Sequence, residues 1–389
     1  MNGQVLNLNR ITFNMLFNVY SQNGLTPVKA SGNYIYNNDG RKYLDCYGGH
    51  GVISIGHNHP KWTEAIAQQF QGISFYSNAV TIPQQEILSQ KLATISGYPD
   101  HALFLINTGA EANENALKVA SFHTKREKVI SFYGSFHGRT SGAMAVSDSQ
   151  SMKSPFNSDH HVQFFNLGDL KVLNEMQNND TAAVIIEGIQ GIAGVVDPGK
   201  EFFIKLRDAC SESGTVLILD EVQSGFGRTG EFFAHLNSGI KADIITMAKG
   251  MGNGFPVGGL LIHPEIEAKQ GMLGSTFGGS YMATAAAIAV IDVLEDQNLL
   301  TNAHAVGKKL VHDLSEIKEI KEVRGRGLML GIELYENSLS SRKKLLEDGI
   351  VTGSSSNQNV LRILPPLTFS YEEASLFTKS LKSILEISS

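Results

Sequence analysis

The sequence predicts an α/β protein with two parts: a large domain around a mostly parallel, doubly wound sheet, and a small α+β domain built from both ends of the chain. From about residue 60 to residue 262, short apolar runs alternate with amphipathic stretches, as strands and helices do around a parallel sheet. The chain of 389 residues is long enough for two domains. We expect residues 1–55 and 281–389 to form the small domain and residues 56–280 the large one.

Each element is predicted from its local pattern. Residues 34–45 form a β-hairpin around an Asp-Gly turn, and a helix begins at Pro60. The runs that we expect to be buried strands are 102–106, 128–131, 182–187, 216–220 and 244–248. Amphipathic helices are expected between them at 84–95 and 201–211. The remaining chain is predicted to contain helices at 282–294, 303–317 and 371–385 and strands at 328–334 and 360–364.

Composition excludes several classes of protein. Hydrophobic residues make up 42% and charged residues 18% of the chain, as in ordinary globular proteins, and the net charge of -6 argues against nucleic-acid binding. The two cysteines, Cys46 and Cys210, cannot form a disulfide framework; we expect both to be buried in a protein of a reducing compartment. The first residues lack the pattern of a signal peptide, and no apolar run approaches transmembrane length, so we expect a cytoplasmic protein.

Two histidines just before the predicted helix at Pro60 raise the question of a metal site. His57 and His59 are separated by one residue, so in a strand they would point to opposite faces. No carboxylate or cysteine partner lies near them in the sequence. We therefore expect a loop that leads into a helix, and no metal.

The most informative stretch places one charged residue at the end of each of two predicted strands. Asp220 ends the run 216–220, and Lys249 follows the run 244–248. In open α/β sheets, ligands bind beyond the carboxyl ends of the strands. A lysine that can form a Schiff base, with a carboxylate for a pyridinium nitrogen, is the minimum set for pyridoxal phosphate. A capping aspartate and a solvated lysine are the alternative interpretation.

Three loops contain further candidate ligands. Residues 107–113 follow a strand and open a helix, whose first N–H groups suit a phosphate, although a simple N-cap by Thr108 or Asn107 explains the pattern equally well. In the loop 133–140, Phe136 or His137 could give a flat face to a ring, or pack internally. The third loop, 274–279, has two adjacent hydroxyls, which can bind phosphate oxygens or a substrate carbonyl.

Arg362 lies inside the apolar run 360–364. An arginine in such a run costs free energy unless its charge is paired. The planar guanidinium matches a substrate carboxylate, and an internal salt bridge is the alternative.

In combination these segments resemble the class III, fold-type I pyridoxal-phosphate aminotransferases, closest to the acetylornithine, succinylornithine and ornithine aminotransferase branch. The resemblance covers nearly the whole chain. Its most specific blocks, in order, are NTGAEANENALKVA, FHGRT, LDEVQSGFGRTG, AKGMGNGFPVGG and GSTFGGS.

The resemblance implies a role for each matching residue. Lys249 would bind pyridoxal 5'-phosphate as a Schiff base and move a proton, while Asp220 would pair with the pyridinium nitrogen. The other cofactor contacts implied are Gly109 and Ala110 at the phosphate, Phe136 and Val222 on the ring faces, Gln223 at the ring hydroxyl, and Thr276 at the phosphate from the partner subunit. The substrate contacts implied are Arg139, Ser275 and Arg362. The active site would therefore lie at the interface of a homodimer.

The implied reaction moves the δ-amino group of N²-acetylornithine or N²-succinylornithine to 2-oxoglutarate, in arginine biosynthesis. Ornithine δ-aminotransferase, 4-aminobutyrate aminotransferase and a lysine-pathway enzyme remain alternatives, and a non-catalytic cofactor-binding regulator is a more distant one. The chain departs from the family at Ile192, where many members have a glutamate that can pair with the substrate arginine. We expect this departure to leave Arg362 open and the adjacent pocket less polar.

Overall fold

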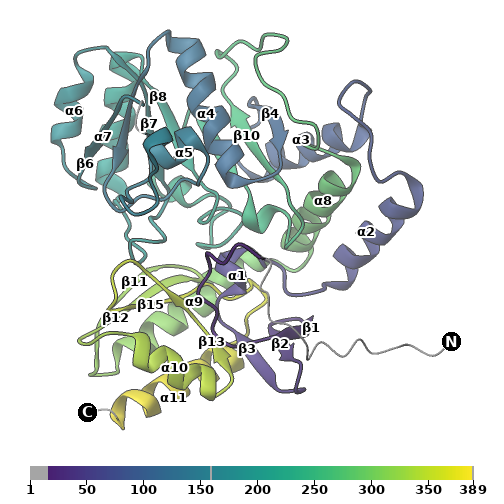
Figure 1. Cartoon of the computed structure of the whole chain (residues 1–389), viewed down its shortest axis with the longest axis vertical. Helices are drawn as coiled ribbons and strands as arrows, with labels where there is room; N and C mark the ends of the chain where they lie inside the picture. Colours follow the sequence, from purple (N-terminus) through teal and green to yellow (C-terminus); the bar gives the residue numbers. More distant parts are fainter. Residues whose placement is uncertain (1–15, 158–159, 388–389) are drawn as a thin grey trace.

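The computed structural model describes residues 16–157 and 160–387. Its large part, at the top of Figure 1, is built around a seven-stranded sheet. In spatial order the strands are β4 (Ala102–Ile106), β10 (Gly258–Ile262), β9 (Ile244–Met247), β8 (Val216–Asp220), β7 (Thr181–Glu187), β5 (Lys128–Phe132) and β6 (Val162–Phe165). Strands β9, β8, β7, β5 and β6 are parallel, and β10 runs antiparallel to both of its neighbours. The predicted α/β class with a mostly parallel sheet is confirmed.

Helices cover both faces of this sheet. Alternate residues of a strand point to opposite faces and pack into two different clusters. In β8, Ile218 packs with the α4 (Gly109–Thr124) residues Ala116 and Val119, whereas Leu217 and Leu219 pack into the cluster that includes α7 (Lys200–Ser213). Every residue of β8 is buried. The other helices of this region are α3 (Pro83–Ile95), α5 (Ser141–Ala145) and α6 (Lys171–Met176), with short 3-10 turns η1 (Pro155–Asn157), η2 (Ala234–Ser238) and η3 (Lys249–Met251).

The small part, at the bottom of Figure 1, combines segments from both ends of the chain. One sheet contains β1 (Pro27–Ser31), β2 (Tyr34–Asn37), β3 (Lys42–Asp45) and β13 (Ile350–Val351), and β13 runs parallel to β3. A second, antiparallel sheet contains β11 (Ile320–Arg326), β12 (Met329–Leu334), β15 (Val360–Ile363) and β14 (Gly353–Ser354). Helices α9 (Leu299–Ser315), α10 (Leu339–Glu347) and α11 (Tyr371–Glu386) complete it. The exact domain boundaries stay a prediction.

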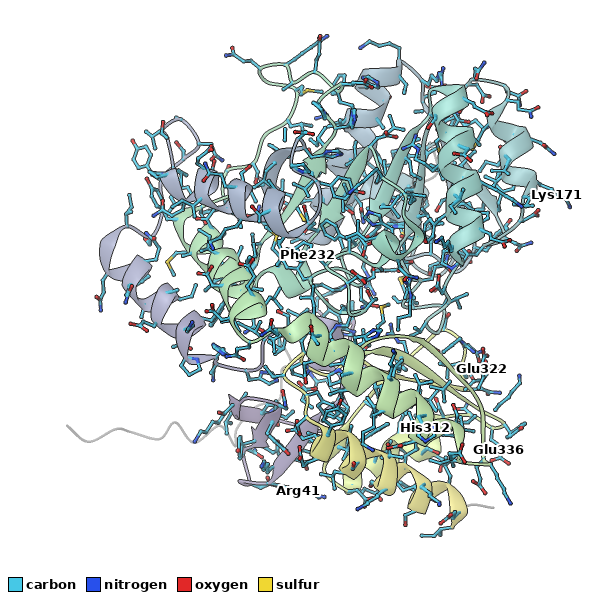
Figure 2. All side chains as sticks on the ribbon, turned by 180° about the vertical axis from the view of Figure 1, so that it is seen from behind. Arg41, Lys171, Phe232, His312, Glu322 and Glu336 are labelled. Atoms are coloured by element: carbon cyan, nitrogen blue, oxygen red, sulfur yellow. The ribbon has the colours of Figure 1, made fainter. Side chains whose placement is uncertain are left out.

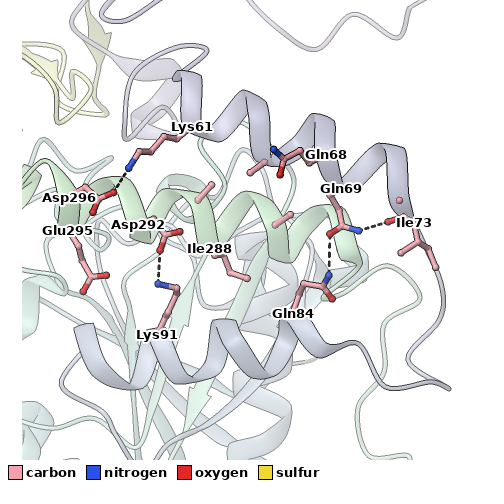
Figure 3. Close-up of a pocket in the computed structure, with 14 residues that line it drawn as sticks. Lys61, Gln68, Gln69, Ile73, Gln84, Lys91, Ile288, Asp292, Glu295 and Asp296 are labelled. Carbon is pink, nitrogen blue, oxygen red and sulfur yellow. Dashed lines mark hydrogen bonds and ion pairs between the residues drawn. The ribbon is translucent and has the colours of Figure 1, made fainter.

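The alanine-rich helix α8 (Tyr281–Asp296) lies between α2 (Pro60–Gly72) and α3, as Figure 3 shows. Most of its residues are buried, and a pocket lined by residues of all three helices lies between them. One ion pair joins each neighbouring helix to α8: Lys61 of α2 pairs with Asp296, and Lys91 Nζ of α3 lies 2.6 Å from Asp292 Oδ1. The predicted buried helix is thus confirmed.

The sorting of polar and apolar side chains is that of a folded globular chain. In Figure 2, Phe232 lies inside the molecule, while Lys171, Glu322 and Glu336 project from its edge. Cys46 and Cys210 are buried and unbridged, as predicted, and burial raises the pKa of the Cys210 thiol to about 12. Within the described residues, no helix is both long and apolar enough to cross a membrane.

The two histidines before α2 require a correction. The sequence placed no carboxylate near them, but His57 Nε2 lies 2.8 Å from Oδ2 of Asp45, the last residue of β3. The expectation of no nearby partner is wrong, because the hairpin folds back onto the loop and brings Asp45 to His57. The Asp45 carboxylate also accepts the N–H groups of Tyr47 and Gly48. Among the described residues, no group of three His, Cys, Asp or Glu side chains is arranged to hold a metal.

Candidate active site

A cavity of about 640 Å³ lies beyond the carboxyl ends of β8 and β9. It brings together most of the residues that the sequence singled out. Those in its wall are Gly109, Ala110, Phe136, Arg139, Ile192, Asp220, Val222, Gln223, Lys249 and Arg362. They come from segments far apart in the sequence: Asp220 ends a strand of the parallel sheet, whose strands end at one edge, and Arg362 comes from β15 of the small part.

Lys249 begins η3 directly after Ala248, with a left-handed φ of 43°. Such a backbone conformation costs on the order of 1–3 kcal/mol in a residue other than glycine, and strained residues of this kind cluster at functional sites. Burial lowers the pKa of the Lys249 ammonium, and the positive charge of Arg362 acts in the same direction. Asp220 and Glu187 oppose this shift without cancelling it. The lysine is therefore tuned toward its neutral, nucleophilic form.

The Asp220 carboxylate is held by three donors. Its Oδ2 accepts hydrogen bonds of 2.7 Å each from Asn113 Nδ2 and from His137 Nδ1, and its Oδ1 accepts the Val222 N–H at 2.9 Å. Asn113 is fixed in turn by the Thr246 hydroxyl at 2.7 Å. The sequence makes His137 a candidate to cover the face of a bound ring, but in the structure its imidazole is buried against Asp220. Phe136, half-buried in the cavity wall, is left for that place.

The N-terminus of α4 forms a compact cradle. Thr108 caps the helix through a reciprocal capping box with Glu111. No described group accepts from the N–H groups of Gly109 and Ala110, which belong to the first turn of the helix. A Cβ on Gly109 would lie 2.6 Å from Val222 Cγ1, so only glycine fits there. Thr108 is the N-cap, as one interpretation of the sequence expects, and the next two N–H groups are available to an anion, which stays a prediction.

Arg362 is buried in β15, and no described Asp or Glu oxygen lies within ion-pair distance of its guanidinium. Its neighbours are neutral: Nη2 donates to the Tyr47 hydroxyl at 3.0 Å, Nη1 to Gln223 Oε1 at 3.4 Å, and Nε to the Ser354 carbonyl at 2.5 Å. Burial lowers the pKa of Arg362. The internal salt bridge that the sequence left open is absent from the described part of the chain.

Two predicted residues lie outside this cavity. The Ser275 hydroxyl accepts from Asn107 Nδ2 at 3.1 Å and from the Gly278 N–H at 3.0 Å, so it holds its own loop together. Thr276 is exposed beside it and does not line the cavity.

Sequence reasoning missed Glu187, which also lines the cavity. Glu187 ends β7 as Asp220 ends β8, and the two residues are paired in register. Its Oε1 accepts the Phe136 N–H at 3.0 Å and its Oε2 the Gly191 N–H at 3.1 Å. Burial and the nearby Asp220 charge raise the pKa of Glu187 to about 7. A carboxylate at the end of an apolar run, the same signal that revealed Asp220, could have found it.

The residues present fit pyridoxal phosphate. The cavity offers a buried amine, a fixed carboxylate, free N–H groups where no side chain fits, and two side chains to cover a ring. This fold with this set of groups defines a fold-type I pyridoxal-phosphate enzyme. The family model described as Aminotransferase class-III matches residues 17–385, and the chain belongs to this family of pyridoxal-phosphate-dependent aminotransferases.

Relatives and solved structures agree with this assignment. The chain is 38% identical over 92% of its length to an acetylornithine aminotransferase from Bacillus cereus, of which it covers 94%. It is 37% identical, with the same two coverages, to a [LysW]-aminoadipate semialdehyde/glutamate semialdehyde transaminase from Sulfolobus acidocaldarius. The crystal structure of ornithine aminotransferase from Toxoplasma gondii is similar with a TM-score of 0.89 and 28% identity, covering 95% of this chain and 92% of that one.

Proposed function

We propose that this aminotransferase moves the δ-amino group of an N²-acylated ornithine, acetylated or succinylated, to 2-oxoglutarate, giving a semialdehyde and glutamate in arginine biosynthesis. The observation that carries the proposal is a cavity with a buried lysine and a buried arginine that has no carboxylate partner among the described residues. The relative named acetylornithine aminotransferase supports the choice of donor.

Lys249 and Asp220 are the proposed catalytic residues. When bound, pyridoxal phosphate supplies an electron sink for the carbon that bears the transferred amine. Lys249 would take a proton from that carbon and return it elsewhere, a role that its lowered pKa favours. Asp220, oriented by Asn113 and His137, keeps the pyridine nitrogen protonated.

Other residues of the chain hold the cofactor in place. Gly109 and Ala110 would hold the phosphate through their N–H groups, and Phe136 and Val222, which line the cavity, would cover the ring. Gln223 is proposed to contact the ring hydroxyl; its Nε2 donates to the His50 carbonyl at 3.0 Å, which sets its orientation.

The substrate is bound by charge. Arg362 takes the α-carboxylate, because its guanidinium is buried and its hydrogen bonds go only to neutral groups. Arg139 and Ser275 are proposed as further substrate contacts; Arg139 lines the cavity from an exposed loop. With Ile192 half-buried in the wall, no carboxylate at that position competes for Arg362.

A homodimer would complete the site. Several large apolar side chains are exposed on one surface formed by the segment 70–80 and Phe277: Phe70, Ile73, Phe75, Tyr76, Val80 and Phe277. The rings of Phe75 and Phe277 lie 5.1 Å apart, and Asn78 Nδ2 donates to the Gly278 carbonyl at 3.0 Å. Thr276 is exposed, directly precedes Phe277 and lies outside its own cavity, so we propose that it binds the cofactor phosphate of a second copy. The proposed location is the cytoplasm.

The first experiment follows the visible absorbance of the cofactor-loaded protein as amino donors are added without an acceptor. We expect N²-acetylornithine or N²-succinylornithine to bleach the band at low concentration, and ornithine or 4-aminobutyrate to bleach it slowly. Bleaching by ornithine alone would assign the enzyme to the δ-aminotransferases. The absence of any band after adding pyridoxal phosphate would contradict the role of Lys249.

A second candidate donor is an N²-acylated lysine, whose transamination gives an aminoadipate-type semialdehyde, because one similar relative is named as a transaminase of such semialdehydes. The same assay with the corresponding N²-acylated lysine separates the two. Faster bleaching by the acyl-lysine than by the acyl-ornithines would favour this second candidate.

A further inference from the structure

His50 lines the cavity and belongs to a run of four residues with left-handed backbone. Gly48, Gly49, His50 and Gly51 have φ values of 54°, 55°, 69° and 76°. Glycine adopts this conformation without steric cost, but a residue with a Cβ pays on the order of 1–3 kcal/mol. His50 is the one non-glycine residue of the run, and its imidazole lines the cavity. Strain at this position points to a function for the side chain.

Hydrogen bonds connect His50 to the arginine of the cavity. Arg362 Nη2 donates to the Tyr47 hydroxyl at 3.0 Å, and that hydroxyl lies 2.7 Å from His50 Nδ1. The His50 carbonyl is fixed as well, because it accepts from Gln223 Nε2. The imidazole is therefore held at both its ring and its backbone.

The donors of this chain assign the His50 tautomer. An arginine only donates, so the Tyr47 oxygen accepts from Arg362, and the one arrangement that uses the phenolic proton has Tyr47 donate to His50 Nδ1. Burial lowers the pKa of His50, and Arg362 and Lys249 act in the same direction, which favours the neutral imidazole. A neutral imidazole that accepts at Nδ1 carries its proton on Nε2. None of the described residues bonds that Nε2.

We propose that His50 selects N-acylated amino donors: its Nε2–H donates to the acyl carbonyl oxygen while Arg362 binds the neighbouring carboxylate. This inference rests on the proposed function and names the residue that distinguishes the acylated donor from the free amino acid. An N-acyl group presents a carbonyl acceptor. A free α-ammonium presents only donors and a positive charge. It would face the donor groups of His50 and Arg362 and the amine of Lys249, and so would find no acceptor among them.

The test uses a pair of probes, N²-acetyl-L-norvaline and L-norvaline, which have the side-chain carbons of the donors but no δ-amine, so neither can undergo the proposed δ-amino transfer. Their affinities for the cofactor-loaded protein are measured by calorimetry. We expect His50→Gly to weaken acetylnorvaline by about 5- to 30-fold, the effect of one lost hydrogen bond, and to change norvaline by less than about 3-fold. In the first half-reaction, the ratio of kcat/KM for N²-acetylornithine over ornithine should fall by the same factor.

Two further variants serve as controls. His50→Asn tolerates left-handed backbone but is too short to reach, so it should reproduce the loss if the glycine variant folds poorly. Lys125→Gly relaxes another left-handed residue (φ 61°) at the end of α4, outside the cavity, and should leave both affinities unchanged.

Equal losses for both probes, or no loss for either, in the His50 variants would overturn the proposal. A wild-type protein that binds norvaline as tightly as acetylnorvaline and prefers ornithine would instead overturn the proposed donor. The two failures are therefore distinguishable.

Discussion

Two buried carboxylates, Glu187 and Asp220, are register neighbours at the ends of adjacent strands, yet their surroundings differ. Asp220 has two side-chain donors and one N–H, whereas Glu187 has only backbone N–H groups. Because backbone amides compensate the loss of water incompletely, burial raises the pKa of Glu187 to about 7. At the scale of the residue, Glu187 can thus take up a proton near neutral pH.

This difference predicts a pH-dependent stability. The folded-state pKa of Glu187 is raised from its usual 4.5 to about 7, so the folded protein binds the proton more tightly than the unfolded chain does. Stability is then lost as pH rises from about 4.5 to about 7, by roughly 3 kcal/mol. Glu187→Gln removes this loss. The free energy of unfolding of the variant should therefore rise relative to that of the wild type above about pH 7, and not below about pH 5. Urea unfolding of the cofactor-free proteins across this range measures it; a difference independent of pH would contradict it.

Replacement of Lys249 by alanine should abolish turnover while cofactor binding persists noncovalently. General base catalysis by a positioned side chain contributes about 10²–10⁴ in rate, and the lost covalent attachment adds to this. Single-turnover bleaching with the acylornithine is the measurement. Lys241→Ala, an exposed lysine outside the cavity, is the matched control, and an unchanged rate in the Lys249 variant would refute the assignment.

At the scale of the element, the start of α4 gives a sharp steric test. A methyl group at Gly109 would lie 2.6 Å from Val222 Cγ1, in the cradle proposed for the phosphate. Gly109→Ala must displace Val222 or the helix start, and we expect the dissociation constant for pyridoxal phosphate to rise at least about 10-fold, the equivalent of one lost charge-assisted hydrogen bond. Gly72→Ala, at the open end of α2 with no atom within 4 Å of its new methyl group, should not change it. Equal affinities of the two variants for the cofactor would contradict the cradle.

The elements also show what the sequence could predict. Strands β4 and β8 have the predicted bounds, because β8 is buried throughout and ends at a charge, and β4 becomes buried toward its end, where a turn containing glycine follows. The short strand β6 was not predicted, since its four residues are all half-buried and resemble a loop. Strand β13, two residues long, exists only because β3 pairs with it. Local pattern finds elements stabilised by burial, and misses those stabilised by a distant partner.

The same limit applies to the site. Asp220, Lys249 and Arg362 were found because a charge interrupts an apolar run. The Asp45–His57 contact and the His50–Tyr47–Arg362 connection depend on segments that meet only in the folded chain, so no local pattern reveals them.

At the scale of the whole molecule, Arg228 joins segments from three regions of the chain. It is buried, and its guanidinium donates to the carbonyls of Leu328, Pro365 and Ile53. Burial lowers its pKa to about 10. Arg228→Met leaves these buried carbonyls without their donor and should destabilise the protein by about 2–4 kcal/mol. Arg41→Met, which removes an exposed arginine bonded to one carbonyl, should cost less than about 1 kcal/mol. Comparable unfolding midpoints for the two variants would show that Arg228 does not join these regions.

The proposed sharing of Thr276 between subunits predicts that two defective proteins can restore one another. Lys249→Ala has no catalytic lysine, and Thr276→Ala lacks the phosphate contact that a second copy would receive. In a mixed dimer, the subunit with an intact Lys249 obtains an intact Thr276 from its partner, so one of its two sites has every residue. At limiting cofactor, where the Thr276 variant alone is weakly active, unfolding and refolding the two proteins together should give more activity than the average of the separate samples. If Thr276 serves its own subunit, or if the apolar surface around Phe75 and Phe277 is not an interface, the refolded mixture should show the average and no more. Where the mixture does gain activity, Phe277→Asp in both chains should abolish that gain, because it places like charges in the interface. This control ties the restored activity to that surface.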